Sequence, residues 1–205
     1  MDRQSHKRYP TIACCGIDCG LCPRYHTEGK SKCPGCLGEE FFEKHPSCSI
    51  VTCCFKKSGY ETCAECPQYP CEKIGKWDRA DSFVTHKKAL ENLSRIKGRG
   101  IGEFARQQKE RMVILDKLLK GYDEGRSKSF FCLAAALMEI DDLREAMSQA
   151  RDIRVNSTDI KQLAKQVKGM LILKAGSKGI ELVYRREKAS HESTRACGAD
   201  RKNGK

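Results

Sequence analysis

Apolar residues recur every three or four positions through most of residues 81–176, and this spacing predicts five amphipathic helices. The clearest pattern predicts a long helix over residues 101–122. The residues on its repeating face are Ile101, Phe104, Gln108, Met112, Leu115, Leu118, Leu119 and Tyr122. We therefore expect residues 76–186 to form a mainly helical domain.

Capping residues and shorter apolar runs mark the other helices. The first should begin at Asp81 or Ser82 and end by Gly100, because Asp and Ser cap helix N-termini and glycine ends helices. A helix beginning at Ser127 or Ser129 is apolar almost all round, which predicts the central core element. Two further helices are predicted over residues 141–150 and 157–176.

The end of the chain has a different pattern. Residues 179–185 alternate between apolar and polar with a period of two, which predicts a strand. Residues 187–205 are polar and charged, and we expect a disordered tail.

Helical periodicity is weak between Cys14 and Cys71, where glycine and proline interrupt the chain. Short helical turns are expected only around residues 38–44 and 52–58. We expect such a region to lack a hydrophobic core of its own and to need cross-links in its place. Residues 1–75 should therefore form a small metal-stabilised cysteine-rich loop domain. The predicted fold class is this domain joined to a mainly α-helical domain with one C-terminal strand.

Twelve of the fourteen cysteines lie between Cys14 and Cys71, and many form C-x2-C pairs. Such a pair places two sulfurs on one tight turn, and two pairs complete the tetrahedral four-thiolate site typical of structural zinc. The run Cys33-Pro34-Gly35-Cys36 has the features of a zinc knuckle. An iron–sulfur cluster also takes four cysteines, and disulfides are a third use of such residues.

Two zinc ions are the preferred interpretation. The first site would use Cys19, Cys22, Cys33 and Cys36. The second would use Cys63, Cys66 and Cys71 with either Cys48 or Cys53, and the sequence leaves that choice open. His26 and His45 are alternative ligands, although the cysteines already suffice.

The cysteine motifs resemble a known prokaryotic family. The runs CGIDCGLC at residues 15–22, CPGC at 33–36 and CAECPQYPCE at 63–72 are similar to the family called domain of unknown function 3795. The resemblance covers residues 13–75, and the helical part is similar to the extension of some archaeal members. It implies metal binding by Cys15, Cys19, Cys22, Cys33, Cys36, Cys48, Cys53, Cys63, Cys66 and Cys71. Cys14 and Cys54 lie outside this pattern, and the resemblance implies no activity.

Charge and hydropathy indicate which compartment and which partners to expect for the protein. The polar start MDRQSHKRYP is unlike a secretory signal and no apolar run is long enough for a membrane span, so a reducing cytoplasm is expected. Residues 76–186 carry 24 Lys/Arg and 15 Asp/Glu, a net charge of +9.

Three functions are consistent with these features. The first is a metal-stabilised binding or scaffold module that contacts a partner protein. The second is nucleic-acid binding through the basic helical region. The third is an iron–sulfur or thiol-based redox enzyme, in which the surplus thiols of Cys14 and Cys54 could react.

Overall fold

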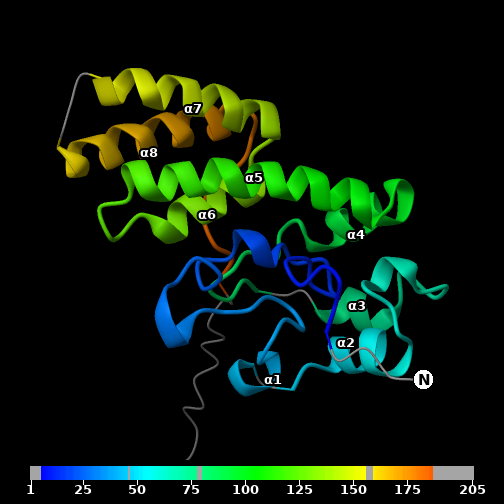
Figure 1. Cartoon of the computed structure of the whole chain (residues 1–205). Coiled ribbons are helices and arrows are strands. Elements are labelled where there is room, and N and C mark those ends of the chain that lie inside the picture. The colour runs from blue at the N-terminus through cyan, green and yellow to red at the C-terminus, as the bar shows by residue number, and fades with distance from the viewer. Residues whose placement is uncertain (1–5, 46, 78–79, 156–158, 187–205) are drawn as a thin grey trace, which may run out of the picture.

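The computed structural model describes residues 6–45, 47–77, 80–155 and 159–186. Helices α7 and α8 form an outer layer above α5 and α6, and the cysteine-rich loops lie on the opposite side of α5 with α1 to α3 (Figure 1). The α-helices are α1 (Phe41–Lys44), α2 (Ser49–Val51), α3 (Glu72–Trp77), α4 (Ala89–Arg99), α5 (Ile101–Tyr122), α6 (Lys128–Leu137), α7 (Ile140–Val155) and α8 (Ile160–Gly176). The shorter elements are the 3-10 helices η1 (Cys19–Leu21), η2 (Gly29–Ser31) and η4 (Cys63–Glu65) and the π-helical segment η3 (Thr52–Lys57).

The predicted helices of the C-terminal part are confirmed. Helix α5 has the bounds that its apolar face predicts, and α6 follows Ser127 at the N-cap position. At the start of α8 the side chain of Asp159 accepts a hydrogen bond from the backbone N–H of Lys161, at 2.9 Å. The predicted caps Ser157 and Thr158 lie outside the described residues.

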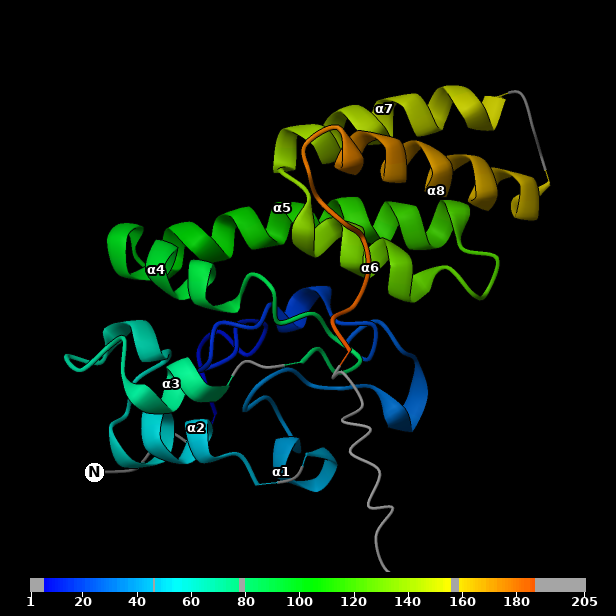
Figure 2. The ribbon, with the colours of Figure 1, turned by 180° about the vertical axis from the view of Figure 1, so that it is seen from behind.

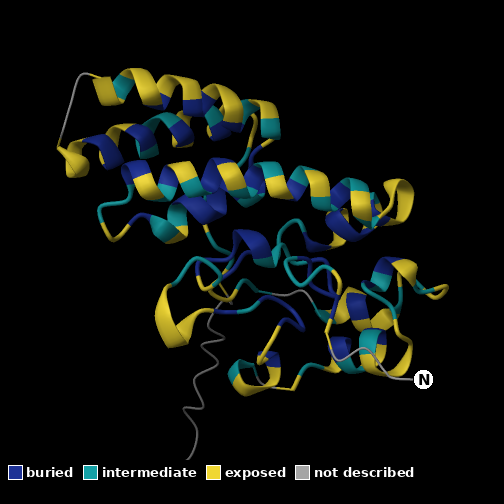
Figure 3. Ribbon diagram, viewed as in Figure 1, coloured by how far each residue is buried: buried dark blue, intermediate teal, exposed yellow. Residues whose placement is uncertain are grey.

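The helical layers share one apolar core. Helix α6 lies beside α5 and α8, and Phe131, Leu143, Val167 and Leu171 are fully buried between the layers. The exposed residues gather on the outer faces of α7 and α8 (Figure 3). Helix α6 is therefore the central core element, as its almost uniformly apolar sequence predicts. Among the described helices, none is long and apolar enough to cross a bilayer.

The predicted start of the first long helix is wrong. Helix α4 begins at Ala89, eight residues after Asp81. The Asp81 carboxylate instead accepts hydrogen bonds from the backbone N–H groups of His86 and Arg185, both at 2.8 Å. A short acidic side chain that satisfies loop N–H groups competes with helix formation, so residues 81–86 form a loop.

The predicted C-terminal strand is also wrong. Within the described ranges, the chain after α8 has no partner strand, and a strand requires a hydrogen-bonded neighbour. Ile180 and Leu182 pack instead against the helical core, and the Tyr184 hydroxyl donates to the carbonyl of Ser129 at 3.2 Å. Figure 2 shows this segment running from α8 past α6 toward the cysteine-rich side. The tail predicted over 187–205 lies outside the described residues.

The cysteine-rich region has more apolar packing than we expected. Ile12, Leu37, Ile50 and Ile74 are almost fully buried in a second cluster. Cys14, Cys15, Cys36 and Cys54 also belong to this cluster, where a thiol acts as a small hydrophobic group. The expectation that this region lacks a core is therefore wrong, because cysteine contributes to packing as well as to chemistry.

Part of this second core comes from the helices. Leu93 and Ile96 of α4 and Phe104 of α5 are buried in the same cluster as the cysteine-rich loops. The side-chain amide of Asn92 donates to the carbonyl of Gly16 at 3.0 Å. The two predicted domains, 1–75 and 76–186, thus share an apolar contact, and their boundary remains a prediction.

This contact predicts that Gly16→Ala destabilises the protein more than Gly59→Ala. Both glycines have positive φ, +86° and +73°, so each alanine meets a backbone cost of about 1–2 kcal/mol. A Cβ on Gly16 would also clash with the Ala89 carbonyl oxygen and lie 2.7 Å from Leu93 Cγ, whereas one on Gly59 has nothing within 4 Å. Overpacking should add about 1–3 kcal/mol at Gly16 alone. Urea unfolding of both variants measures the difference, and equal losses would contradict the close contact.

Candidate metal centre

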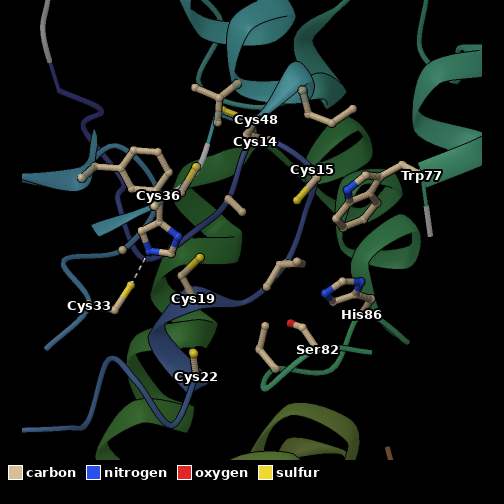
Figure 4. Close-up of a pocket in the computed structure, with 18 of the residues that line it drawn as sticks. Cys14, Cys15, Cys19, Cys22, Cys33, Cys36, Cys48, Trp77, Ser82 and His86 are labelled. Atoms are coloured by element: carbon tan, nitrogen blue, oxygen red, sulfur yellow. Dashed lines mark hydrogen bonds between the residues drawn. The ribbon is translucent and has the colours of Figure 1, made fainter. Parts of the chain in front are cut away.

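Seven cysteines line one cavity of about 480 Å³ in the cysteine-rich region. They come from loops that are far apart in sequence, and the labelled cysteines lie opposite Trp77, Ser82 and His86 (Figure 4). We call these cysteines set A: Cys14, Cys15, Cys19, Cys22, Cys33, Cys36 and Cys48. All four members of the first predicted site, Cys19, Cys22, Cys33 and Cys36, belong to set A.

The C-x2-C pairs are positioned by 3-10 turns. Helix η1 begins at Cys19, and the N–H of Cys22 donates to the carbonyl of Cys19 at 3.1 Å. Helix η4 repeats this arrangement with Cys63 and Cys66, at 3.2 Å. A capping box between Thr62 and Glu65 stabilises the second turn. Each pair therefore lies on one tight turn, as the spacing predicts.

The Cys33–Cys36 turn depends on glycine. Gly35 has a φ of +85°, and a Cβ at this position would clash with the backbone of Pro10. The N–H of Cys36 donates to the carbonyl of Pro10 at 2.7 Å, which fixes the turn against the N-terminal segment. His45 then lies close by, with its Nε2 atom 3.1 Å from Cys33 Sγ.

The remaining cysteines surround a second and much smaller cavity of about 30 Å³. We call them set B: Cys53, Cys54, Cys63, Cys66 and Cys71. Cys53 lines this cavity, whereas Cys48 lines the large one. The sequence left Cys48 and Cys53 as alternative fourth partners of Cys63, Cys66 and Cys71. Of these two, Cys53 lines the small cavity with them.

Cys14 and Cys54, the two thiols outside the family pattern, connect the two sets. Cys14 lies beside Cys36 and Cys54, and Cys54 lies beside Cys63. The neighbouring thiols lower the pKa of Cys14, and Cys54 likewise lowers the pKa of Cys63. Cys14 and Cys54 are only 1% and 4% exposed, which shields both from reagents in solution.

Burial affects three other set A thiols. It raises the pKa of Cys15, Cys19 and Cys22 above the ordinary value of a thiol. These groups are therefore neutral at pH 7 unless a positive charge lies beside them. A bound metal ion is one such charge, because it takes thiolates as ligands.

Gln108 of α5 and Asp18 of the Cys15–Cys19 loop form a polar contact that the sequence did not reveal. Gln108 is 3% exposed, and its amide nitrogen donates to the carbonyl of Thr11 at 2.7 Å and to the carboxylate of Asp18. Burial raises the pKa of Asp18 to about 6. Asp18 thus joins the Cys15–Cys19 loop to α5. The sequence signal that could have indicated this contact is Gln108 itself, a polar residue on an otherwise apolar helix face.

A second feature that sequence reasoning missed is the wall opposite the thiols. Trp77, at the end of α3, stacks on His86 with ring centroids 4.9 Å apart and an interplanar angle of 13°. Both line the large cavity. His26, by contrast, places Nε2 at 2.8 Å from the Gly20 carbonyl and is thereby directed at the backbone.

The available donor atoms are cysteine sulfurs, which are the kind of ligand that a thiophilic metal prefers. None of the thirteen described cysteines forms a disulfide, and the C-x2-C turns hold sulfurs in pairs. In the described part of the chain, however, no three Cys, His, Asp or Glu side chains stand in a metal-binding arrangement. The sulfurs line the cavity walls without converging on one point. A cysteine sulfur can change its position by rotation about χ1 alone.

These features define a cysteine-rich domain built on paired thiols and followed by a helical region. Residues 11–76 match the family described as protein of unknown function (DUF3795). The match spans about a third of the chain and confirms the resemblance that the cysteine motifs carry. No curated protein and no solved structure matched the chain in the corresponding comparisons.

Proposed function

We propose that residues 11–76 bind two zinc ions through separate groups of four thiolates, and that the resulting domain is a binding module supported by the helices. The observation that carries this proposal is the division of the ten pattern cysteines between two cavities. Cys53, Cys63, Cys66 and Cys71 surround a space of about 30 Å³, which suits one ion. A closed four-thiolate site of this kind is structural.

The larger site has more room than one ion requires. Cys19, Cys22, Cys33 and Cys36 are its proposed zinc ligands, and Cys15 and Cys48 line the same cavity of about 480 Å³. This volume also favours an iron–sulfur cluster as the alternative occupant of set A, since a cluster takes four cysteines as well. Thiol chemistry at Cys14 and Cys54 is not proposed, because a reactive cysteine needs exposure.

Metal content of cysteine variants tests the grouping. Cys53→Ser and Cys66→Ser should each lose about one metal equivalent, and the double variant should lose no more, because a four-thiolate site that loses one ligand already fails. Cys22→Ser combined with Cys66→Ser should lose both ions. Elemental analysis of protein purified without air gives the counts, and a visible spectrum distinguishes iron from colourless zinc.

The control for this experiment is Cys132→Ser. Cys132 is a thiol buried in α6, outside both sets, and its loss should leave the metal content unchanged. Additive losses from Cys53→Ser and Cys66→Ser would show that these residues serve different ions. Wild-type protein without bound metal would disprove the proposal as a whole.

Metal removal should affect the two parts of the chain differently. A chelator should disorder the cysteine loops, because a bound ion contributes its binding energy to their folding. The core of α5 to α8 contains none of the proposed ligands and should remain helical. Far-ultraviolet circular dichroism should therefore retain most of its helical signal, while proteolysis should cut between residues 14 and 71. Resistance of that stretch after complete metal removal would contradict a structural role.

Nucleic-acid binding through α8 is a second candidate function. Helix α8 contains four lysines and no acidic residue. Lys174 is paired with Glu145 at 2.6 Å, which leaves Lys161, Lys165 and Lys168 on the remaining length of the helix. Such a basic helix suits the phosphate backbone of a nucleic acid.

Charge reversal tests this candidate. Lys161→Glu with Lys165→Glu should weaken binding to a duplex and lower the slope of log K against log salt by about 2, or roughly one per lost phosphate contact. Lys30→Glu with Lys32→Glu makes the same change in net charge on the cysteine-rich region and should have little effect. Equal effects of the two pairs, or no binding at low salt, would remove α8 as a nucleic-acid surface.

A further inference from the structure

The cavity beside set A has a second wall that contributes no cysteine. This wall consists of Trp77, Ser82, Phe83, Val84 and His86, with Ile50 and Val51 of α2 beside it. In Figure 4, the labelled members of this wall face the cysteines across the pocket. A four-thiolate site would occupy only the cysteine side of this pocket, so the space between the thiols and the aromatic wall is available to a second occupant.

The second wall is held rigidly by the helical part. The Asp81 side chain is fully buried and forms an ion pair with Arg185, Nη2 to Oδ1, at 3.1 Å. The backbone N–H of Asp81 donates in turn to the carbonyl of Arg185 at 3.0 Å. Asp81 Oδ1 also accepts from the N–H of His86. Residues 82–86 are thus fixed at both ends, and the wall is formed before any ligand arrives.

The lining of the cavity limits what could bind there. Among the described residues, the lining contains no Asp, Glu, Lys or Arg, and its ionisable side chains are the cysteines, His45 and His86. An anionic ligand would therefore find no cationic side chain in this lining and would face the thiolates proposed for set A, which is costly in an apolar site. The polar groups available are few and neutral: the hydroxyls of Ser47, Ser49 and Ser82 and the imidazoles. This composition is typical of pockets for small organic molecules.

The volume agrees with this class of ligand. About 480 Å³ lies within the range of roughly 300–1,000 Å³ found for small-molecule sites. One metal ion held by set A would fill only a small part of that space. Flat rings of Trp77 and Phe83 line the remainder, which favours a planar ligand that packs against aromatic surfaces.

We propose that this cavity binds a compact, mainly apolar organic molecule that has a planar ring and no negative charge, between the set A thiols and the wall of Trp77, Ser82, Phe83, Val84 and His86. The inference deepens the proposed function and rests on it in one respect: the thiols of the first wall are the proposed metal ligands. It assigns the binding module a small-molecule ligand.

The chain carries its own reporter for this site. Trp77 is its single tryptophan and lies in the cavity wall. The probe is prodan, an uncharged naphthalene ketone whose absorption overlaps tryptophan emission. Prodan should bind saturably at one site of the metal-replete protein, quench Trp77 and shift its own emission to the blue. An anionic naphthalene sulfonate should bind about tenfold more weakly or worse, because its charge would be buried without a partner.

Variants locate the binding. Val84→Phe and Ser82→Leu add bulk to the wall and should each weaken prodan binding by about tenfold or more, since a filled pocket cannot be occupied. Val113→Phe adds bulk to the exposed face of α5, where Val113 is 48% exposed, and should leave affinity unchanged. Circular dichroism verifies folding, and either wall variant is sufficient should the other fail to fold.

The results separate this inference from the proposed metal sites. Absence of saturable binding, equal weakening by Val113→Phe, or tighter binding of the sulfonate would overturn the inference even with two metal ions bound. Binding that depends on Val84 and Ser82 in protein shown by elemental analysis to lack metal would support the ligand site and overturn the metal proposal.

Discussion

The cysteine-rich loops pack their apolar side chains against Leu93, Ile96 and Phe104, and the thiols that belong to this cluster owe their positions to that contact. The loops have few regular elements, so their own backbone hydrogen bonds cannot fix their positions. Helices α4 and α5 provide a rigid surface in their place. The close approach of Gly16 to Ala89 and the polar contact of Gln108 with Thr11 and Asp18 determine the register of the loops on that surface.

Once the loops are fixed in this way, their cysteines separate into two environments. Set B surrounds a cavity of about 30 Å³ next to α3 and η4. Set A opens onto a cavity that the linker before α4 completes with aromatic side chains. The two groups of thiols are chemically alike, but their cavities differ in volume, about 30 Å³ against about 480 Å³. In the proposed function, this difference separates a closed structural site from a site with room for a ligand, and the helical part contributes Trp77, Ser82, Phe83, Val84 and His86 to the second site.

The sequence predicted the helices well because their apolar periodicity reflects local geometry. Helix α5 has the predicted bounds, and the C-x2-C turns have the predicted compactness, since both depend on residues close in the chain. The predictions that failed involve distant partners. Asp81 was predicted to cap a helix, but its carboxylate binds the backbone N–H of Arg185. Residues 179–185 have the alternation of a strand, but their apolar side chains pack against the helices. The sequence did not reveal the wall of Trp77 and His86 for the same reason, because this wall faces cysteines that are 29 or more residues away in the chain.

Cysteine has two proposed uses in this protein, and exposure helps to distinguish them at set B. Cys14, Cys54 and Cys132 are buried, and the gain from removing a small apolar side chain from water is enough to explain them. Cys53 is exposed and Cys63, Cys66 and Cys71 are only partly buried, so packing gives little reason for a thiol at these four positions. They nevertheless lie around one small cavity, two of them on a single 3-10 turn. Thiols that contribute little to a core, yet line one small cavity beside a capped turn, are the ones for which ligation is the more economical explanation, so the support for the metal proposal is strongest at set B.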